Sequence, residues 1–207
     1  TVTGSQHLIE VNGKRILLDC GLFQGHRAAT YTRNQTFLYD PATIDVLVLS
    51  QAHIDHSGNI PNLVRRGFTG DIVCTSATRD LAATMLLDSA HIQESDAEYL
   101  NKQRAKRGEL PIEPLYTQED ARNCLGQFVT REYERSAEIA NGVTCTFHDA
   151  GHMLGSAFVV LDIEDRDAGN DVRVVFSGDL GRKGLPILRD PATVDRADVL
   201  ILESTYG

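Results

Sequence analysis

The densest group of chemically capable side chains lies at residues 50–58, which read SQAHIDHSG. His53, Asp55 and His56 stand close together, directly after a short apolar run that ends at Leu49. Imidazole nitrogens and carboxylate oxygens are ligands that zinc takes in proteins. Two histidines and an aspartate on a turn after a rigid strand therefore suit a metal site.

Two further turns deliver residues of the same types. Residues 151–156, GHMLGS, place His152 between glycines and between two expected strands. Residues 176–181, FSGDLG, place Asp179 in a glycine-flanked turn after a strand. A lone histidine is more often a satisfied polar residue than a ligand. Three separate strand-end turns of this kind are hard to explain by chance, so they predict a shared metal centre.

The expected secondary structure explains how distant turns can meet. Strands are expected over 7–11 and 14–20 around Asn12-Gly13, and over 44–49, 71–75, 143–148, 156–163, 172–177 and 198–203. Helices are expected over 60–66, 78–107 and 117–128, the last opened by a capping box of Thr117 and Asp120. Strands early and late with helices between them indicate a layered α/β architecture.

Composition narrows the class of protein. The 207 residues are 42% hydrophobic, which is enough for one domain with a sizeable core or for one large piece of a bigger protein. No apolar run approaches the roughly 20 residues of a membrane span. The net charge of -9 argues against a wholly basic nucleic-acid coat, but not against a nucleic-acid enzyme whose metal ions supply positive charge. The 4 cysteines form no CxxC pair, and with no signal region they predict free thiols in a cytoplasmic protein.

In combination the motifs resemble those of the metallo-β-lactamase superfamily. The resemblance rests on HxDH after a strand, on GHxxGS and on SGDxG. Neighbouring motifs resemble the β-CASP branch of RNA-processing nucleases: VTGS at 2–5, LLDCG at 17–21, FQG at 23–25, HSGNIP at 56–61 and LESTYG at 202–207. The resemblance implies an αββα sandwich that is incomplete at its C-terminal end. It also implies that residues 1–207 are the N-terminal part of this domain, with the β-CASP domain and the last strands absent.

The resemblance assigns metal ligands residue by residue. It implies that His53 and His152 bind a first zinc ion and that Asp55 and His56 bind a second. Asp179 would bridge the two ions.

The same resemblance implies a reaction and a partner. The reaction is hydrolysis of RNA phosphodiester bonds, either endonucleolytic or 5′-to-3′ exonucleolytic. Asp55 would orient the attacking nucleophile, Asp19 would orient the ligand loop, and Glu203 would assist proton transfer together with a histidine further along the chain. RNA is the implied partner, and a homo-oligomer of the full-length protein is left open.

One position departs from the family pattern HxHxDH. Gln51 stands where the first histidine belongs, and an amide oxygen is a poorer zinc ligand than an imidazole nitrogen. A single metal, a water molecule in place of the imidazole, and an inactive site are all compatible with this change. The alternatives to a zinc-dependent ribonuclease are therefore an inactive or weakly active RNA-binding or scaffold relative, and a small-molecule hydrolase of the superfamily. The ESTYG and QG motifs speak against the last of these.

The remaining candidates have plainer explanations. Structural or surface roles are expected for the other four histidines, His7, His26, His91 and His148. The basic run at 102–107 is expected to be a solvated helix end, with RNA contact as the alternative. For Arg182 and Lys183 the two possibilities are an ordinary solvated turn and contact with substrate.

Overall fold

The computed structural model describes residues 3–25 and 27–205, and two five-stranded sheets organise them. The first sheet has the order β1-β2-β3-β4-β5. Its strands are β1 (His7–Val11), β2 (Lys14–Leu18), β3 (Val46–Val48), β4 (Asp71–Thr75) and β5 (Phe128–Arg131). Only β1 runs antiparallel to its neighbour, while β2 to β5 pair in parallel.

The second sheet has the order β10-β9-β8-β7-β6. Its strands are β6 (Ala137–Ala140), β7 (Val143–Asp149), β8 (Ala157–Asp165), β9 (Asn170–Phe176) and β10 (Val199–Ile201). Successive strands from β6 to β9 pair antiparallel, and β10 joins β9 in parallel. Strands β7, β9 and β10 therefore point the same way, so their C-terminal ends share one edge of the sheet.

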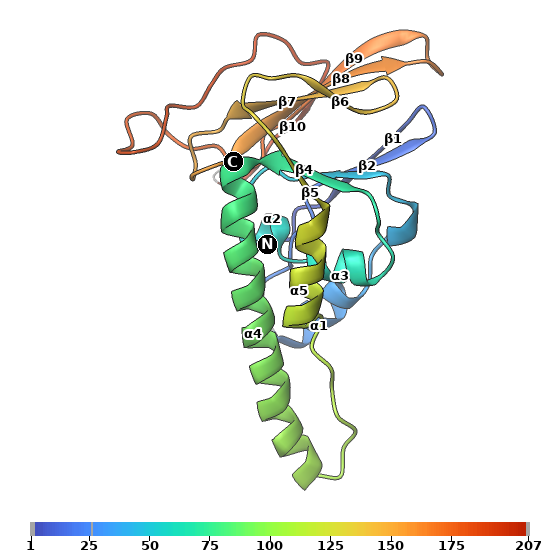
Figure 1. Ribbon diagram of the computed structural model, residues 1–207, viewed down its shortest axis with the longest axis vertical. Helices are drawn as coiled ribbons and strands as arrows, with labels where there is room; N and C mark the ends of the chain where they lie inside the picture. The colour runs from blue at the N-terminus through green and yellow to red at the C-terminus, as the bar shows by residue number, and fades with distance from the viewer. Residues whose placement is uncertain (1–2, 26, 206–207) are drawn as a thin grey trace.

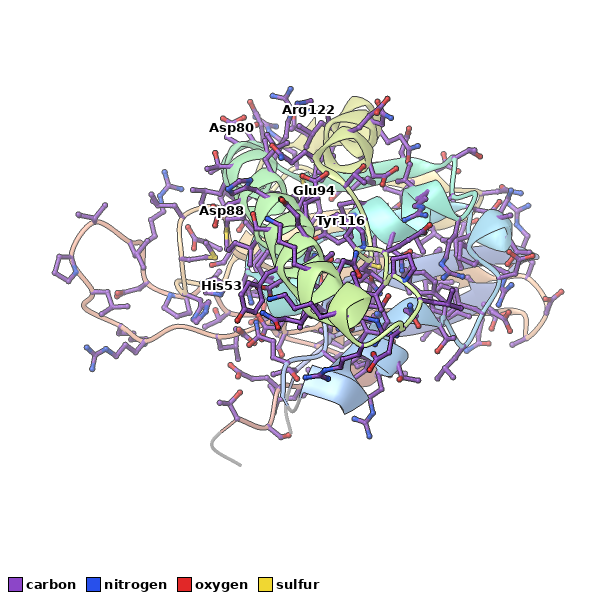
Figure 2. The ribbon with its side chains drawn as sticks, turned by 90° about the horizontal axis from the view of Figure 1, so that it is seen from below. His53, Asp80, Asp88, Glu94, Tyr116 and Arg122 are labelled. Atoms are coloured by element: carbon purple, nitrogen blue, oxygen red, sulfur yellow. The ribbon has the colours of Figure 1, made fainter. Side chains whose placement is uncertain are left out.

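Helices cover the face of the first sheet that lies away from the second (Figure 1). They are α1 (Arg27–Gln35), α2 (Ile54–Ser57), α3 (Ile60–Arg65), α4 (Ser76–Lys106) and α5 (Gln118–Cys124), with short 3-10 turns at Pro41–Thr43 and Leu125–Gln127. The buried Tyr116 packs in this layer, and its hydroxyl lies 2.9 Å from Ser89 Oγ of α4 (Figure 2). None of the helices in residues 3–25 and 27–205 combines the length and the hydrophobicity that crossing a bilayer demands.

The apolar runs of the sequence are explained by burial on both faces of the first sheet. Along β2, Leu17 points into the helix layer, whereas Ile16 and Leu18 point toward the second sheet, because side chains alternate along a strand. Phe147 and Phe176 of the second sheet complete that inner core. Helix, sheet and sheet thus form three of the four layers of the expected αββα sandwich. No helix of the described residues covers the outer face of the second sheet.

Most expected elements are confirmed, and four were missed. No sequence pattern predicted α1, α2, β5 or β6, and the helix expected to continue to Phe128 ends in a 3-10 turn before β5. The capping box of Thr117 and Asp120 is present. Strand β2 stops at Leu18 rather than residue 20, because Asp19 takes a left-handed conformation with φ of 58°.

Candidate metal centre

The candidate site lies where the C-terminal ends of several parallel strands meet. His53 and His56 follow β3, and Asp19 follows the adjacent parallel strand β2. His152 follows β7 and Asp179 follows β9, at the matching edge of the second sheet. Loops at the ends of rigid strands commonly carry functional side chains. The two stacked sheets therefore bring together residues that are distant in sequence.

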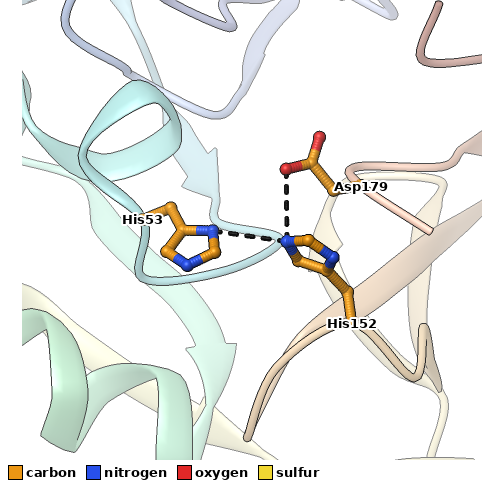
Figure 3. Close-up of side chains that lie close together, drawn as sticks. All are labelled: His53, His152 and Asp179. Carbon is orange, nitrogen blue, oxygen red and sulfur yellow. Dashed lines mark hydrogen bonds and ion pairs between the residues drawn. The ribbon is translucent and has the colours of Figure 1, made fainter. Parts of the chain in front are cut away.

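His53, His152 and Asp179 form the tightest cluster, with one ligand atom from each lying within 4.8 Å of the others (Figure 3). His53 Nδ1 lies 3.4 Å from His152 Nε2, which lies 3.5 Å from Asp179 Oδ2. Zinc–nitrogen bonds of about 2.0–2.1 Å place two tetrahedral ligands about 3.3 Å apart. The observed separations therefore match the edges of a zinc coordination tetrahedron.

A second group shares Asp179. Its other oxygen, Oδ1, lies 3.3 Å from His56 Nε2, and Asp55 Oδ2 lies 4.0 Å from the same nitrogen. One carboxylate thus presents one oxygen to each group of ligands. All five residues expected to bind metal gather here, and the donor set of imidazoles and carboxylates fits divalent cations.

Asp19 fixes the orientation of His56. Its buried carboxylate accepts a hydrogen bond of 2.6 Å from His56 Nδ1. It also accepts bonds from the Ser50 amide at 2.8 Å, the Ser50 hydroxyl at 2.9 Å and the Ser5 hydroxyl at 3.1 Å. Since Nδ1 carries the proton given to Asp19, Nε2 is left to face Asp179. The sequence resemblance named Asp19 but not the two serines; the position of Ser50 immediately after a buried strand was the available signal.

His56 and Asp179 shift each other's pKa values, so that both groups are charged in the absence of a metal ion. Burial lowers the pKa of His56, but the charge of Asp19 and the hydrogen bonds to Asp179 and Asp19 raise it to about 10. Burial raises the pKa of Asp179, but the hydrogen bond and charge of His56 outweigh it and hold this pKa at about 2. Burial and the charge of His152 lower the pKa of His53. His53 is therefore a neutral imidazole, whereas His56 carries a proton that a cation would have to displace.

Gln51 also lies beside the cluster. Its side chain is 1% exposed and lies beside Asp179, whose low pKa it helps to maintain. Neither Nε2 nor Oε1 forms a hydrogen bond of normal length and angle. Buried polar groups without partners are rare in folded proteins. An orphaned amide beside histidines and a carboxylate fits a site built around a cation.

Two glycines allow the ligand loops to approach each other. A Cβ atom on Gly21 would lie 1.6 Å from the carbonyl oxygen of Asp55, and one on Gly181 would lie 1.8 Å from that of Gly151. The amide of Gly181 donates to Ala150 at 2.8 Å, which holds the Asp179 loop against the His152 loop. These contacts leave no room for a side chain at either glycine.

Glu203 lies in a neighbouring cleft rather than in the cluster. The cleft has a volume of about 410 Å³, and its lining includes His7, Asp55, His56, Asp179 and Glu203. Glu203 Oε1 accepts from the amide of Leu180 at 2.6 Å, and Oε2 accepts from the Thr205 hydroxyl at 2.7 Å. The carboxylate is therefore anchored to the loop that carries Asp179. Of the LESTYG motif, residues 206 and 207 lie outside the described residues, as does Val2 of the VTGS motif.

The other histidines are placed as follows. His7 lines the cleft, with its ring 5.3 Å from that of Phe176, and burial lowers its pKa; its proximity to the site was not foreseen. His148 pairs with Glu134 at 2.9 Å and stacks on Phe158 at 4.8 Å. His91 is exposed, as expected for a surface residue. His26 lies outside the described residues.

The basic residues are partly neutralised or exposed. Lys102 pairs with Glu98 at 2.8 Å, and Arg104 pairs with Glu109 at 3.0 Å, which favours the solvated helix end over an RNA contact. Arg182 and Lys183 are both exposed on the turn after Asp179.

Comparison with known proteins identifies the family. A family model described as a metallo-beta-lactamase superfamily domain matches residues 8–168. Ribonuclease TTHA0252 of Thermus thermophilus is 36% identical over 207 residues, covering 100% of this chain and 42% of that protein. Transcription termination factor FttA of Methanococcus maripaludis is 32% identical over 198 residues, covering 93% of this chain and 28% of that protein. The chain thus spans less than half the length of either relative.

A solved structure agrees at the level of the fold. A metallo-β-lactamase HARLDQ-motif mutant from Cronobacter sakazakii superimposes with a TM-score of 0.52 at 18% identity, covering 89% of this chain and 60% of that one. The resemblance predicted from the motifs is confirmed, and a ribonuclease stands among the relatives. The chain belongs to the metallo-β-lactamase superfamily.

Proposed function

We propose that this protein is a zinc-dependent ribonuclease of the β-CASP branch that hydrolyses RNA phosphodiester bonds. The observation that carries the proposal is the placement of Asp179, whose Oδ1 and Oδ2 lie 3.3 and 3.5 Å from the Nε2 atoms of His56 and His152. A carboxylate flanked on both sides by imidazoles suits a pair of cations. The ribonuclease among the relatives supports RNA as the substrate.

The chain's own residues would hold two ions and orient the substrate. His53 and His152 would bind the first ion, His56 and Asp55 the second, and Asp179 both. Two such ions, when bound, lower the pKa of a water molecule and neutralise charge on phosphoryl oxygens.

Asp19, Asp55 and Glu203 have roles beyond holding the ions. Asp19 keeps His56 in the tautomer whose Nε2 is free. Asp55, which lines the cleft, would also orient the attacking water. Glu203, anchored in the same cleft, would assist proton transfer to the leaving 3′ oxygen.

A second candidate is an RNA-binding or scaffold protein without activity, and Gln51 is the observation that favours it. Two measurements separate the candidates: zinc per chain by elemental analysis, and cleavage of single-stranded RNA labelled at either end. The ribonuclease proposal expects close to two zinc ions per chain and defined cleavage products. RNA binding with no cleavage, at full zinc occupancy, would favour the scaffold instead.

Two variants that each replace one aspartate by asparagine test whether the metal cluster is the site of RNA cleavage. Asp179→Asn is expected to lower the cleavage rate at least about 100-fold, because a group shared by both ions is lost. Asp88→Asn removes an exposed carboxylate on α4 and is the control (Figure 2). Equal activity in the two variants would refute the assignment of the site.

We also propose a cytoplasmic location, which is supported by the four unpaired and buried cysteines Cys20, Cys74, Cys124 and Cys145.

A further inference from the structure

The side-chain amide of Gln51 is buried without a hydrogen-bond partner. Gln51 lies three residues after the end of β3 at Val48, is 1% exposed, and leaves both polar atoms of its amide without a hydrogen bond of normal length and angle. Among the described residues, no other side chain has two buried unpaired polar atoms; Gln127, the comparable amide, leaves only Oε1 unpaired and donates through Nε2 to Phe68. A buried amide of this kind is costly unless a partner satisfies it.

The cluster beside Gln51 supplies such a partner. His53, His152 and Asp179 present three ligand atoms within 4.8 Å of one another, and a four-coordinate ion needs a fourth. Gln51 precedes His53 by two residues, and its amide interacts with the Asp179 carboxyl and lowers the pKa of that group, although no hydrogen bond of normal length and angle joins them. The amide is therefore close enough to the cluster to supply the fourth ligand atom. A half-turn about the last side-chain bond exchanges Oε1 and Nε2, so the oxygen can face the ion while the nitrogen faces away.

We propose that Gln51 Oε1 is a ligand of the first ion, and that it weakens the preference of this site for zinc over manganese. The inference rests on the proposed function, since it assumes that the cluster binds a divalent cation. The donor set becomes two imidazole nitrogens, one carboxylate and one amide oxygen. Imidazole favours zinc, whereas carboxylate and carbonyl oxygens suit manganese. Exchanging one imidazole for an amide oxygen therefore reduces the selectivity for zinc.

The first test compares the affinities of Zn²⁺ and Mn²⁺ in the wild type and in Gln51→His. Competition with a chromophoric chelator gives the affinities, and the binding step lost in His152→Ala is assigned to the first site. Gln51→His is expected to raise the zinc affinity of that step by about 10–100-fold, with little change for manganese. An unchanged ratio of the two affinities would overturn the inference, as would a wild type in which the first site binds neither ion.

The second test uses thermal unfolding, a readout that does not depend on cleavage. Gln51→Leu removes the unpaired amide at similar size, so the chelated protein is expected to melt at a higher temperature than the chelated wild type. The gain in Tm on adding Mn²⁺ is expected to fall. Gln127→Leu is the control, because it removes a partly buried amide with one unpaired atom in the turn after α5 and should leave the Mn²⁺-dependent gain unchanged.

The outcomes distinguish this inference from the proposed function. If Gln51→Leu keeps the full Mn²⁺-dependent gain in Tm, Gln51 is not a ligand and the inference is wrong, even if the wild type cleaves RNA. If the affinities and melting temperatures change as expected but RNA stays intact, the ligand assignment stands and the ribonuclease proposal fails.

Discussion

Replacing Asp19 by asparagine separates the charge of this residue from its shape. Asparagine has nearly the same volume and tolerates the left-handed conformation that Asp19 adopts, with φ of 58°. It offers one oxygen and one NH₂ group in place of two oxygens. If the oxygen keeps the hydrogen bond from the Ser50 amide, the NH₂ group faces His56 Nδ1. His56 must then accept at Nδ1 and carry its proton on Nε2, the atom that faces Asp179.

The structure sets the size of two expected effects. Removing one partner of a buried ion pair costs about 3–5 kcal/mol, and the retained hydrogen bond to Ser50 places Asp19→Asn near the lower end. For a protein of this size, a loss of about 3 kcal/mol lowers Tm by about 6–12 °C. Metal affinity at the site that uses His56 should fall by about 10–100-fold, the usual effect of losing a hydrogen-bond partner of a ligand.

Three measurements check the reasoning. Thermal unfolding gives the stability, chelator competition gives the zinc affinity, and imidazole nitrogen NMR identifies the tautomer of His56. Asp45→Asn is the control, because Asp45 is a surface carboxylate that accepts from Lys14 Nζ at 2.7 Å, and its loss should cost no more than about 1 kcal/mol. If Asp19→Asn binds zinc with wild-type affinity and keeps the proton on Nδ1, the role given to Asp19 is refuted.

Three further outcomes are expected. Gly181→Ala should unfold the protein or abolish metal binding, because its methyl group would lie 1.8 Å from Gly151 O; Gly126→Ala, which meets nothing within 4 Å, should match the wild type in Tm. Thr78→Val should lower the free energy of urea unfolding by about 1 kcal/mol, because the buried hydroxyl donates to Gly155 O at 2.8 Å; an unchanged value would count against that bond. The stabilisation from His56 in the chelated protein should be complete below pH 6.5 and be lost as the pH rises through 10, since its pKa is raised to about 10; a flat profile of urea unfolding over that range would contradict this.

The sequence predicted the parts of the fold that depend on local patterns. Strands such as β8 and β9 were visible because their apolar residues are buried, and α5 was visible because Thr117 and Asp120 form a capping box. Helix α1 was missed because it is mostly polar, with only Asn34 buried among its described side chains. Strands β5 and β6 were missed because they are short edge strands, defined by pairing with partners far along the chain rather than by their own periodicity.

The candidate site also has features that local sequence patterns predict and features that depend on the tertiary structure. Residue types and turns were sufficient to nominate His53, His152 and Asp179. The sharing of Asp179 between two histidines depends on how the sheets stack, which no local pattern encodes. The same holds for the four hydrogen bonds that converge on Asp19 and for the unpaired state of the Gln51 amide.

The origin of the ligands on opposite sheets links metal affinity to the inner core. His53 is attached to the first sheet, whereas His152 and Asp179 are attached to the second. A shift of one sheet over the other would therefore change the distance between His53 and His152. A cavity made deep between the sheets, as by Phe147→Ala, would thus alter ion binding without touching a ligand. A metal titration of such core variants would therefore report on how the two sheets are aligned.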